Sequence, residues 1–393
     1  MSLAADPADP AGSTDLTGTV WSTLVGQKHA TRTLQRAVDG HGMTHAWLFT
    51  GPPGSGRSNA ALAFAAALQC EQGGCGRCRA CQTALAGSHS DVSVTRSRRA
   101  VIQTEPMREL VLRAALSPAG GRWQVMVIED ADRLHERAAN ALLKAIEEPT
   151  RKTVWLLCAP TVEDVLPTIR SRCRNVSLTT PTAEEVAGFL SRTAGVYEPL
   201  AAFAARASQG HIGRARALAL DERTRNRRRE VVSIPAGLSS LGACMNAAAN
   251  LVDIAKDETE SLNVESGEEE VKALESVYGD DRKAKSSRAY RAALKELLYD
   301  QKQRDKRRTL DVVDRCLMDL MSVYRDQIAL QSGAPGALVN EEMRGELAGL
   351  ASRSTPELNL RRIDAIFRAR EQMLEFQVPP LLALESMMLS LRL

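Results

Sequence analysis

The sequence predicts an α/β domain with a doubly wound parallel sheet, followed by an all-helical region. Three observations predict this division. Up to about residue 180, short apolar runs alternate with segments of helical periodicity, and a glycine-rich loop follows one of those runs. From about residue 238 the periodicity is almost wholly helical. A chain of 393 residues, 44% of them apolar, has room for two or three domains.

The composition narrows the class of protein. Only 4% of the residues are aromatic, while Ala, Leu and Arg are abundant, which is typical of helix-rich proteins. The formal net charge of +3 is nearly balanced, so any contact with DNA must be local or shared with partners. The sequence shows no signal-peptide pattern and no run of about 18 apolar residues. We therefore expect a cytoplasmic protein, with a disordered tail over residues 1–16, which are rich in Ala, Asp and Pro.

A phosphate-binding loop with one altered residue joins the first predicted strand to a helix. The apolar run 46–50 precedes the segment GPPGSGRS, and an Ala-rich helical segment spans 58–68. In loops of the pattern G-x-x-x-x-G-K-[ST], glycines let backbone N–H groups face phosphates, lysine reaches the β- and γ-oxygens, and the hydroxyl holds Mg²⁺. The candidate nucleotide-binding residues are Gly51, Pro52, Pro53, Gly54, Ser55, Gly56, Arg57 and Ser58.

Arg57 occupies the position of the lysine in this pattern. It keeps the positive charge, but its guanidinium is a wide planar fork, whereas the loop favours a compact ammonium in a narrow cradle. The loop therefore predicts the scaffold of an ATPase with altered chemistry. The alternative is a turn of Gly and Pro residues that binds nothing.

A second polar element ends the predicted strand 123–130. Glu129 and Asp130 stand where a nucleotidase places its Mg²⁺ ligand and the acid that polarises water. The usual order is Asp then Glu, and here it is reversed. Because phosphoryl transfer depends on positions held to within about one ångström, the reversal also indicates altered chemistry.

Further elements complete the predicted α/β domain. An amphipathic helix spans 138–150 and is stopped by Pro149. The run 153–158 is predicted to be another buried parallel strand. Residues 168–174 then follow a short helical segment.

Four cysteines form a candidate metal site just after the helix that follows the loop. Their spacing is C-x4-C-x2-C-x2-C with glycines between, a knuckle suited to tetrahedral Zn²⁺. Four thiolates leave no open position for water, so we expect a structural zinc. The alternatives are a reduced cluster without metal and, less favoured, an iron–sulfur cluster. The predicted ligands are Cys70, Cys75, Cys78 and Cys81, and the lone thiols predicted to be buried are Cys158, Cys244 and Cys316.

A small helical domain is predicted over 181–237. Thr182 caps its first helix, and Glu185 stands at the capping-box position. The basic run 221–230 is predicted to form a solvated helix face, with a contact to DNA phosphates as the minority alternative.

The region 238–393 is predicted to be helical throughout. It is interrupted by the charged segment 256–308, whose acidic block 265–270 and basic block 302–308 predict a partly flexible or long exposed helical arm.

Several of these motifs, in this order, carry a resemblance to a known family. The opening LVGQ at 24–27, the loop, the cysteine knuckle, NALLKAIEEP at 140–149 and the Ser-Arg-Cys signature at 171–173 together resemble bacterial DNA polymerase III clamp-loader subunits of the AAA+ superfamily. The C-terminal FQVPPLLALESMMLSL also resembles the family's oligomerisation domain. The resemblance implies a P-loop domain over 17–180, a helical lid over 181–237 and a helical collar over 238–393.

The family contains ATP-hydrolysing motor subunits, gamma and tau, and a related subunit that does not hydrolyse ATP. Motor subunits carry a polar sensor residue after the strand that follows the carboxylate pair, where this chain has Ala159 or Pro160. They also carry an arginine in the lid, where this chain has Gly213, with Arg214 one residue later. Together with Arg57 and the reversed carboxylates, these departures predict a member that does not hydrolyse ATP. The alternatives are an active motor subunit and a module that binds nucleotide without hydrolysing it.

Arg172 is the residue that the resemblance marks for function. In this family the arginine of the Ser-Arg-Cys signature reaches the ATP site of a neighbouring subunit and stabilises charge on the phosphoryl group. The alternative is a surface arginine near a helix end, and the flanking Arg170 and Arg174 are predicted to make solvated or structural pairs. The resemblance further implies a hetero-oligomer with a delta subunit and three motor copies, acting on a sliding clamp and primed DNA in the bacterial replisome.

Overall fold

The computed structural model describes residues 18–96, 102–120, 122–278 and 287–392. The predicted tail 1–16 lies outside this range. The chain divides into two compact units, of which the first ends at Pro181 and the second begins at Thr182. Within the described ranges, no helix is long and apolar enough to cross a membrane.

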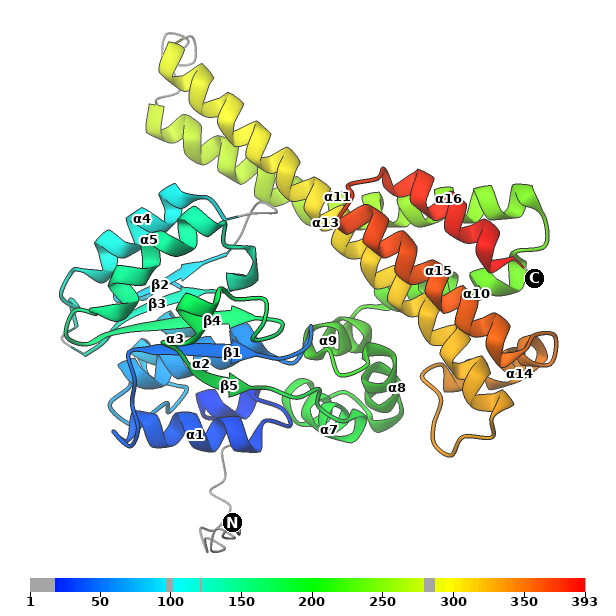
Figure 1. The fold of residues 1–393 in the computed structure, drawn as a ribbon, viewed down its shortest axis with the longest axis horizontal. Helices are drawn as coiled ribbons and strands as arrows, with labels where there is room; N and C mark the ends of the chain where they lie inside the picture. The colour runs from blue at the N-terminus through cyan, green and yellow to red at the C-terminus, as the bar shows by residue number, and fades with distance from the viewer. Residues whose placement is uncertain (1–17, 97–101, 121, 279–286, 393) are drawn as a thin grey trace, which may run out of the picture. The chain divides into compact units, whose positions relative to one another are not determined.

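The first unit is built on a five-stranded parallel sheet with strand order β2-β3-β4-β1-β5 (Figure 1). This confirms the predicted parallel α/β fold. The predicted strand positions agree with β1, β3 and β4 to within two residues at each end. The strands are β1 (Ala46–Thr50), β2 (Val92–Thr95), β3 (Gln124–Ile128), β4 (Thr153–Ala159) and β5 (Arg174–Ser177).

Helices cover both faces of this sheet, which makes it doubly wound. Alternate residues of β1 enter different cores: Trp47 and Phe49 pack with α1, α2 and α3, whereas Ala46 and Leu48 pack with α4, α5 and α6. A strand buried on both faces must be apolar throughout, and all five residues of β1 are buried. The helices are α1 (Lys28–Val38), α2 (Arg57–Gln69), α3 (Arg79–Leu85), α4 (Thr104–Ala114), α5 (Glu136–Glu147) and α6 (Pro167–Arg170), with short 3₁₀ turns at η1 (Val20–Thr23) and η2 (Ala131–Arg133).

The second unit is helical, as predicted. Its first helix begins with the predicted capping box, in which the Thr182 hydroxyl and the Glu185 carboxylate each accept the other residue's backbone N–H. Its helices are α7 (Ala183–Ala194), α8 (Glu198–Ser208), α9 (Ile212–Leu220), α10 (Glu222–Gly237), α11 (Leu241–Tyr278), α13 (Arg288–Gln331), α14 (Arg344–Ala351), α15 (Pro356–Leu374) and α16 (Pro380–Leu391), with the 3₁₀ turn η3 (Glu341–Met343) before α14.

The described residues of the charged segment, 256–278 and 287–308, lie mainly in two long helices. The end of α11 and the start of α13 pack side by side and extend beyond the other helices of their unit (Figure 1). The prediction of a long exposed helical arm is therefore confirmed for the described residues.

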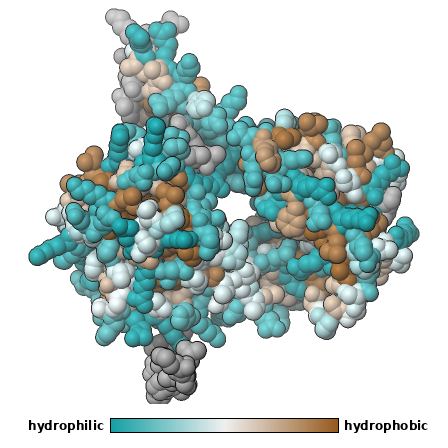
Figure 2. Space-filling view, in the orientation of Figure 1, coloured by the Kyte–Doolittle hydropathy of each residue, from teal (hydrophilic) through white to brown (hydrophobic). Residues whose placement is uncertain are grey.

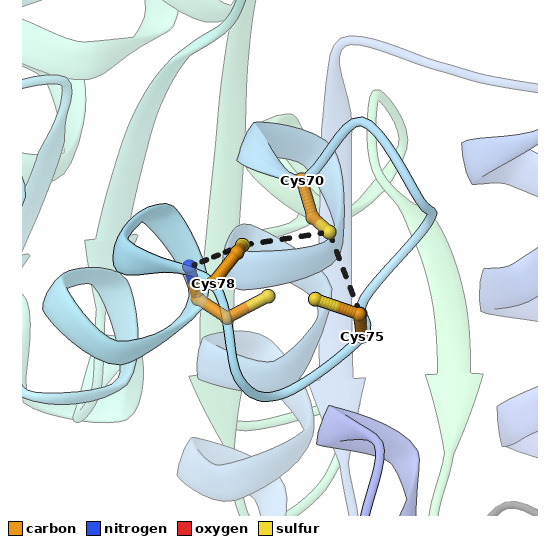
Figure 3. A group of neighbouring side chains, drawn as sticks. Cys70, Cys75 and Cys78 are labelled. Atoms are coloured by element: carbon orange, nitrogen blue, oxygen red, sulfur yellow. Dashed lines mark hydrogen bonds between the residues drawn. The ribbon is translucent and has the colours of Figure 1, made fainter.

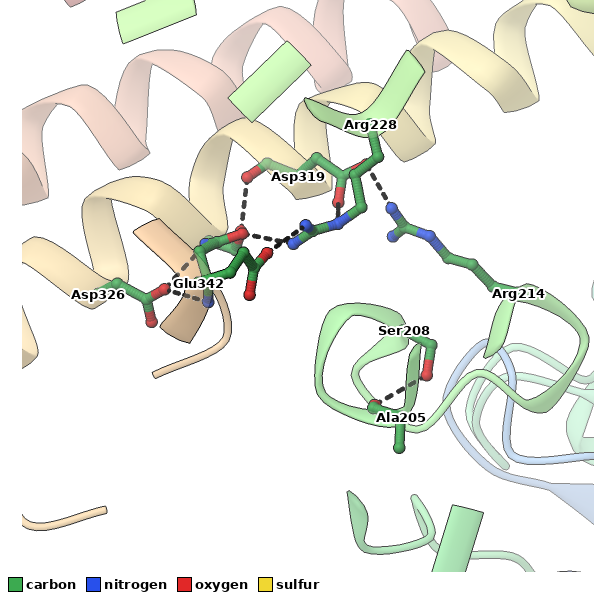
Figure 4. Close-up of polar contacts among 9 residues, drawn as sticks. Ala205, Ser208, Arg214, Arg228, Asp319, Asp326 and Glu342 are labelled. Atoms are coloured by element: carbon green, nitrogen blue, oxygen red, sulfur yellow. Dashed lines mark hydrogen bonds and ion pairs between the residues drawn. The ribbon is translucent and has the colours of Figure 1, made fainter. Parts of the chain in front are cut away.

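A buried charge network joins α9 and α10 to α13 (Figure 4). Asp319 pairs with both Arg214 and Arg228, and the Arg228 guanidinium also donates to Asn340 and Glu342. Only 5% of Arg228 is exposed. The prediction of a solvated basic face over 221–230 is thus wrong for Arg228, because its side of α10 packs on α13 together with Val231.

Removing the shared carboxylate should destabilise the second unit strongly. Asp319→Ala would remove the carboxylate that pairs with Arg214 and would leave Arg228 with Glu342 as its one ion-pair partner among the described residues. Losing one partner of a buried pair costs about 3–5 kcal/mol. Denaturant unfolding of the full chain measures this loss. The matched control is Asp253→Ala, whose carboxylate pairs with Lys256 at the surface and is 67% exposed. Equal losses in both variants would contradict the prediction.

Candidate functional site

The phosphate-binding loop lies between β1 and α2, at the carboxyl edge of the sheet. Its glycines are required by geometry: a Cβ on Gly51 would lie 2.6 Å from the Leu178 carbonyl oxygen and 2.6 Å from Ser55 Oγ. Gly56 caps α2 in the left-handed region, with φ of 92° and open space where a side chain would lie. A glycine-rich turn that opens a helix exposes backbone N–H groups and the positive end of the helix dipole, an arrangement suited to an anion.

Arg57 is turned back onto its own loop. Its Nη1 donates a hydrogen bond to the Gly51 carbonyl oxygen at 2.5 Å. The Ser55 hydroxyl beneath the loop is buried and has no hydrogen-bond partner among the described residues. The loop thus keeps the shape of a phosphate-binding loop, while the guanidinium of Arg57 is hydrogen-bonded to the loop's own backbone.

The carboxylate pair lies at the same edge of the sheet. Glu129 and Asp130 follow β3, and the register from β3 through β4 to β1 is continuous, so the three strand ends lie in line. Glu129 Oε1 forms an ion pair with Arg96 Nε at 3.0 Å, and the Glu129 side chain is only 14% exposed. Its charge is therefore balanced by an arginine of this chain.

Cys158, near the end of β4, shows that these groups share one environment. Burial raises the pKa of its thiol well above the usual range. The carboxylates of Glu129 and Asp130 raise it further, and the Arg57 guanidinium opposes them. Cys158 is buried as predicted, and so are Cys244 and Cys316.

Gln27 connects the loop to the residues that follow β5. Its side-chain amide donates to the backbone oxygens of Ser55 at 3.3 Å and Thr179 at 2.6 Å, and its carbonyl accepts the Thr179 N–H at 3.1 Å. Gln27 is 4% exposed. The LVGQ motif at 24–27 predicted no contact for Gln27, because the partners of this residue lie up to 152 positions away in the chain.

Arg172 lies just after α6 and is held by local contacts. Its Nη1 donates to the Thr168 carbonyl oxygen at 2.7 Å and to Ser171 Oγ at 3.2 Å, and its guanidinium pairs with Glu147 at the end of α5. The Arg172 and Glu147 side chains are 37% and 45% exposed. Exposed ion pairs contribute little stability, so Arg172 can exchange this partner for a stronger one.

The four cysteines converge at the other end of α2 (Figure 3). Cys70 ends α2, Cys75 and Cys78 lie in the following turn, and Cys81 belongs to α3. All four ligand atoms lie within 4.8 Å of one another, and the sulfurs of Cys70 and Cys78 are 3.7 Å apart. Tetrahedral Zn–S bonds of about 2.3 Å place sulfurs about 3.8 Å apart, so the arrangement fits a metal ion.

The backbone around the cysteines favours thiolates, the form that binds metal. Burial opposes ionisation of Cys70, but backbone N–H groups, that of Cys75 foremost, lower the pKa of its thiol to about 6. Backbone N–H groups also lower the pKa of Cys75. Burial raises the pKa of Cys81, so a bound ion would displace the proton of that thiol.

The predicted site residues therefore fall into three places. The loop and the two carboxylates meet at the carboxyl edge of the sheet. The cysteine cluster lies at the far end of α2, about 20 Å of helix away. Among the described residues, Arg172 contacts Glu147 of α5, Thr168 of α6 and the adjacent Ser171, and none of these belongs to the loop.

Comparison with known proteins finds relatives of residues 26–182. Residues 26–182 match the family described as DNA polymerase III, delta subunit. DNA polymerase III subunit delta-prime of Pseudomonas aeruginosa is 39% identical over 155 residues, which cover 38% of this chain and 47% of that protein. DNA polymerase III subunit gamma/tau of Mycobacterium tuberculosis is 34% identical over 160 residues, covering 39% of this chain and 27% of that protein.

A solved structure of a DNA polymerase III gamma subunit-related protein from Thermotoga maritima covers 86% of this chain and 99% of its own, at 16% identity and a TM-score of 0.38. This chain spans about half or less of the length of the curated relatives named above. The first unit is a doubly wound parallel α/β fold with a glycine-rich loop between β1 and α2. Residues 26–182 are thus similar to DNA polymerase III subunits of the delta, delta-prime and gamma/tau types.

Removing a metal ion from the cysteine cluster should loosen the neighbouring backbone. The cluster's glycines hold η1: Trp21 Nε1 donates to the Gly73 carbonyl oxygen at 3.1 Å, and the Val20 N–H donates to that of Gly74 at 3.0 Å. We expect a zinc chelator to accelerate amide hydrogen exchange at residues 18–24 and 70–81, with little change elsewhere.

The matched variants are Cys75→Ser and Cys173→Ser, both at half-buried thiols. The first should reproduce the effect of the chelator and the second should not. Unchanged exchange at 70–81 after chelation would contradict a metal at this cluster.

Proposed function

We propose that this chain is the delta-prime subunit of a bacterial DNA polymerase III clamp loader, which does not hydrolyse ATP and donates Arg172 to the ATP site of a neighbouring motor subunit. The observation that carries the proposal is the hydrogen bond from Arg57 to the Gly51 carbonyl oxygen. A motor needs a cation directed at the β- and γ-phosphates, and here that cation is bound to the loop itself.

The carboxylates support the same conclusion. Hydrolysis needs one carboxylate on Mg²⁺ and another that orients water. Glu129 is paired with Arg96, and its order with Asp130 is reversed. Arg57 and Glu129 thus both depart from the motor pattern, and both are bonded to other groups of this chain.

The sensor positions add to this argument. β4 ends at Ala159, and Pro160 offers only its backbone oxygen, which accepts the Gly51 N–H at 3.0 Å. Arg214, next to the expected position of the lid arginine, is paired with Asp319 inside the second unit. Neither position supplies a free polar side chain to a γ-phosphate.

The loop retains features that fit a bound nucleotide. The glycine geometry and the unpartnered Ser55 hydroxyl would suit phosphate oxygens. In this proposal ATP or ADP, when bound, is held by Gly51–Ser58, and no hydrolysis follows. A bound nucleotide would supply a charged group for the cradle to hold, and Arg57 would have to leave Gly51 to reach it.

Zinc at the cysteine cluster is proposed as a structural ion. The four thiolates would fill its coordination sphere and exclude water as a ligand. We also propose that 17–180 is the P-loop domain, 181–237 the lid and 238–393 the collar, within a cytoplasmic complex with delta and gamma/tau subunits that acts on the sliding clamp and primed DNA.

The role of Arg172 can be tested in the reconstituted complex. An arginine finger contributes about 10³ to 10⁵ in rate in well-studied cases. With three motor copies and one Arg172, Arg172→Ala should remove about one third of the fast amplitude in single-turnover ATP hydrolysis and leave the rest unchanged.

Arg170→Ala is the control, since Arg170 is exposed and makes no ion pair with the described residues. If the complex with Arg172→Ala shows the same fast amplitude of ATP hydrolysis as the unaltered complex, the proposed role of Arg172 as an arginine finger is wrong. Arg172→Lys should also lose fast amplitude, because an ammonium lacks the planar fork.

A second candidate function, the ATP-hydrolysing motor subunit, is favoured by the relatives named gamma/tau. Single-turnover hydrolysis by the isolated chain separates the two candidates. We expect no turnover, and we expect Arg57→Ala to leave this result unchanged. Turnover that disappears in Arg57→Ala would support the motor instead.

A further inference from the structure

The exposed arm carries an asymmetric distribution of charge. The arm consists of residues 256–276 of α11 and 288–308 of α13, and Figure 2 shows a largely hydrophilic surface over its projecting part. Acidic residues dominate the α11 part and basic residues the α13 part. Glu258 and Glu270 of α11 are neutralised by Arg315 and Arg304 of α13, respectively, and these contacts hold the two helices together.

Five cations along one side of the α13 part of the arm take no part in these contacts, and Arg308, also exposed and without an ion pair among the described residues, lies on another side of the helix. The five are all exposed, and none makes an ion pair or side-chain hydrogen bond with the part of the chain that the structure describes. We call them the basic stripe: Arg288, Arg291, Lys295, Lys302 and Lys306.

The basic stripe is continuous along one side of the helix. At 100° per residue its five positions fall within an arc of about 60°, and at 1.5 Å per residue they cover about 27 Å. The carboxylates in the α13 part of the arm fall outside this arc; they are Glu296, Asp300 and Asp305. A charged helix side is usually mixed in sign, whereas this one is uniformly positive.

We propose that the basic stripe binds the phosphate backbone of double-stranded DNA. A duplex carries one phosphate every 3.4 Å along each strand, so about eight phosphates of a strand pass along a stripe about 27 Å long. Lysine and arginine heads on flexible stems suit this contact. The choice of DNA over an acidic protein rests on the proposed function in DNA replication.

The contact would position the DNA without reading its sequence. Cations that meet phosphates release condensed counterions, so the affinity falls with salt in proportion to the number of phosphates neutralised. The stripe lies outside the loop and the cysteine cluster, so DNA binding by this surface does not depend on Arg172 or on ATP.

The test measures binding of the full chain to a 25-base-pair duplex by fluorescence anisotropy over a range of salt. Replacing all five cations of the stripe with glutamine should reduce the slope of log K against log[salt] by about four. The control replaces five exposed arginines scattered elsewhere and changes the charge equally: Arg216, Arg223, Arg353, Arg361 and Arg368.

A slope that drops only in the stripe variant supports the proposal. An unchanged slope overturns it, and so does an equal drop in the scattered control, which would indicate attraction by net charge alone. Binding of a polyglutamate peptide but not of the duplex would also overturn it in favour of an acidic protein. Circular dichroism checks that the variants remain helical. Failure here would leave the Arg172 experiment unaffected.

Discussion

The pairing of β1 with β4 on one side and β5 on the other is the constraint on which the first unit depends. It buries every residue of β1 and brings the strand's end to the carboxyl edge of the sheet. Ligands of open parallel sheets bind at that edge. The chain leaves β1 so close to the end of β5 that Gly51 has no room for a side chain. The shape of the loop at Gly51 therefore follows from the packing of the strands and does not require a bound nucleotide.

The charges around the cradle are balanced within the chain. Arg57 meets a carbonyl oxygen and Glu129 meets Arg96. In an active ATPase these groups would face phosphate and Mg²⁺ instead. Arg172, in contrast, is held only by surface contacts with Glu147 and its own helix turn. Arg57 and Glu129, at the chain's own loop site, thus each have a partner within the chain. Arg172, which we propose enters a neighbour's site, has only half-exposed contacts among the described residues.

Local patterns predicted most of the fold. Strands β1, β3 and β4 and the capping box at Thr182 were predictable because their signals lie within a few residues of one another. The cysteine cluster was predictable for the same reason. The sequence could not predict the partners of Gln27 or Arg228, because Thr179 and Asp319 are distant in the chain and meet them only through packing. Burial of Arg228 in particular reversed a prediction made from charge alone.

The four cysteines of the cluster lie within twelve residues of one another, so a metal ion there would close only very short loops of chain. A cross-link lowers the entropy of the unfolded chain in proportion to the logarithm of the loop that it closes. A metal there restricts the unfolded chain little. Its effect would be local: it would fix a glycine-rich turn whose carbonyl groups accept hydrogen bonds from Trp21 and Val20 of η1. Gln27 follows η1 a few residues later. A metal ion at the cysteine cluster would thus help to hold η1, the first described element of the chain, in place.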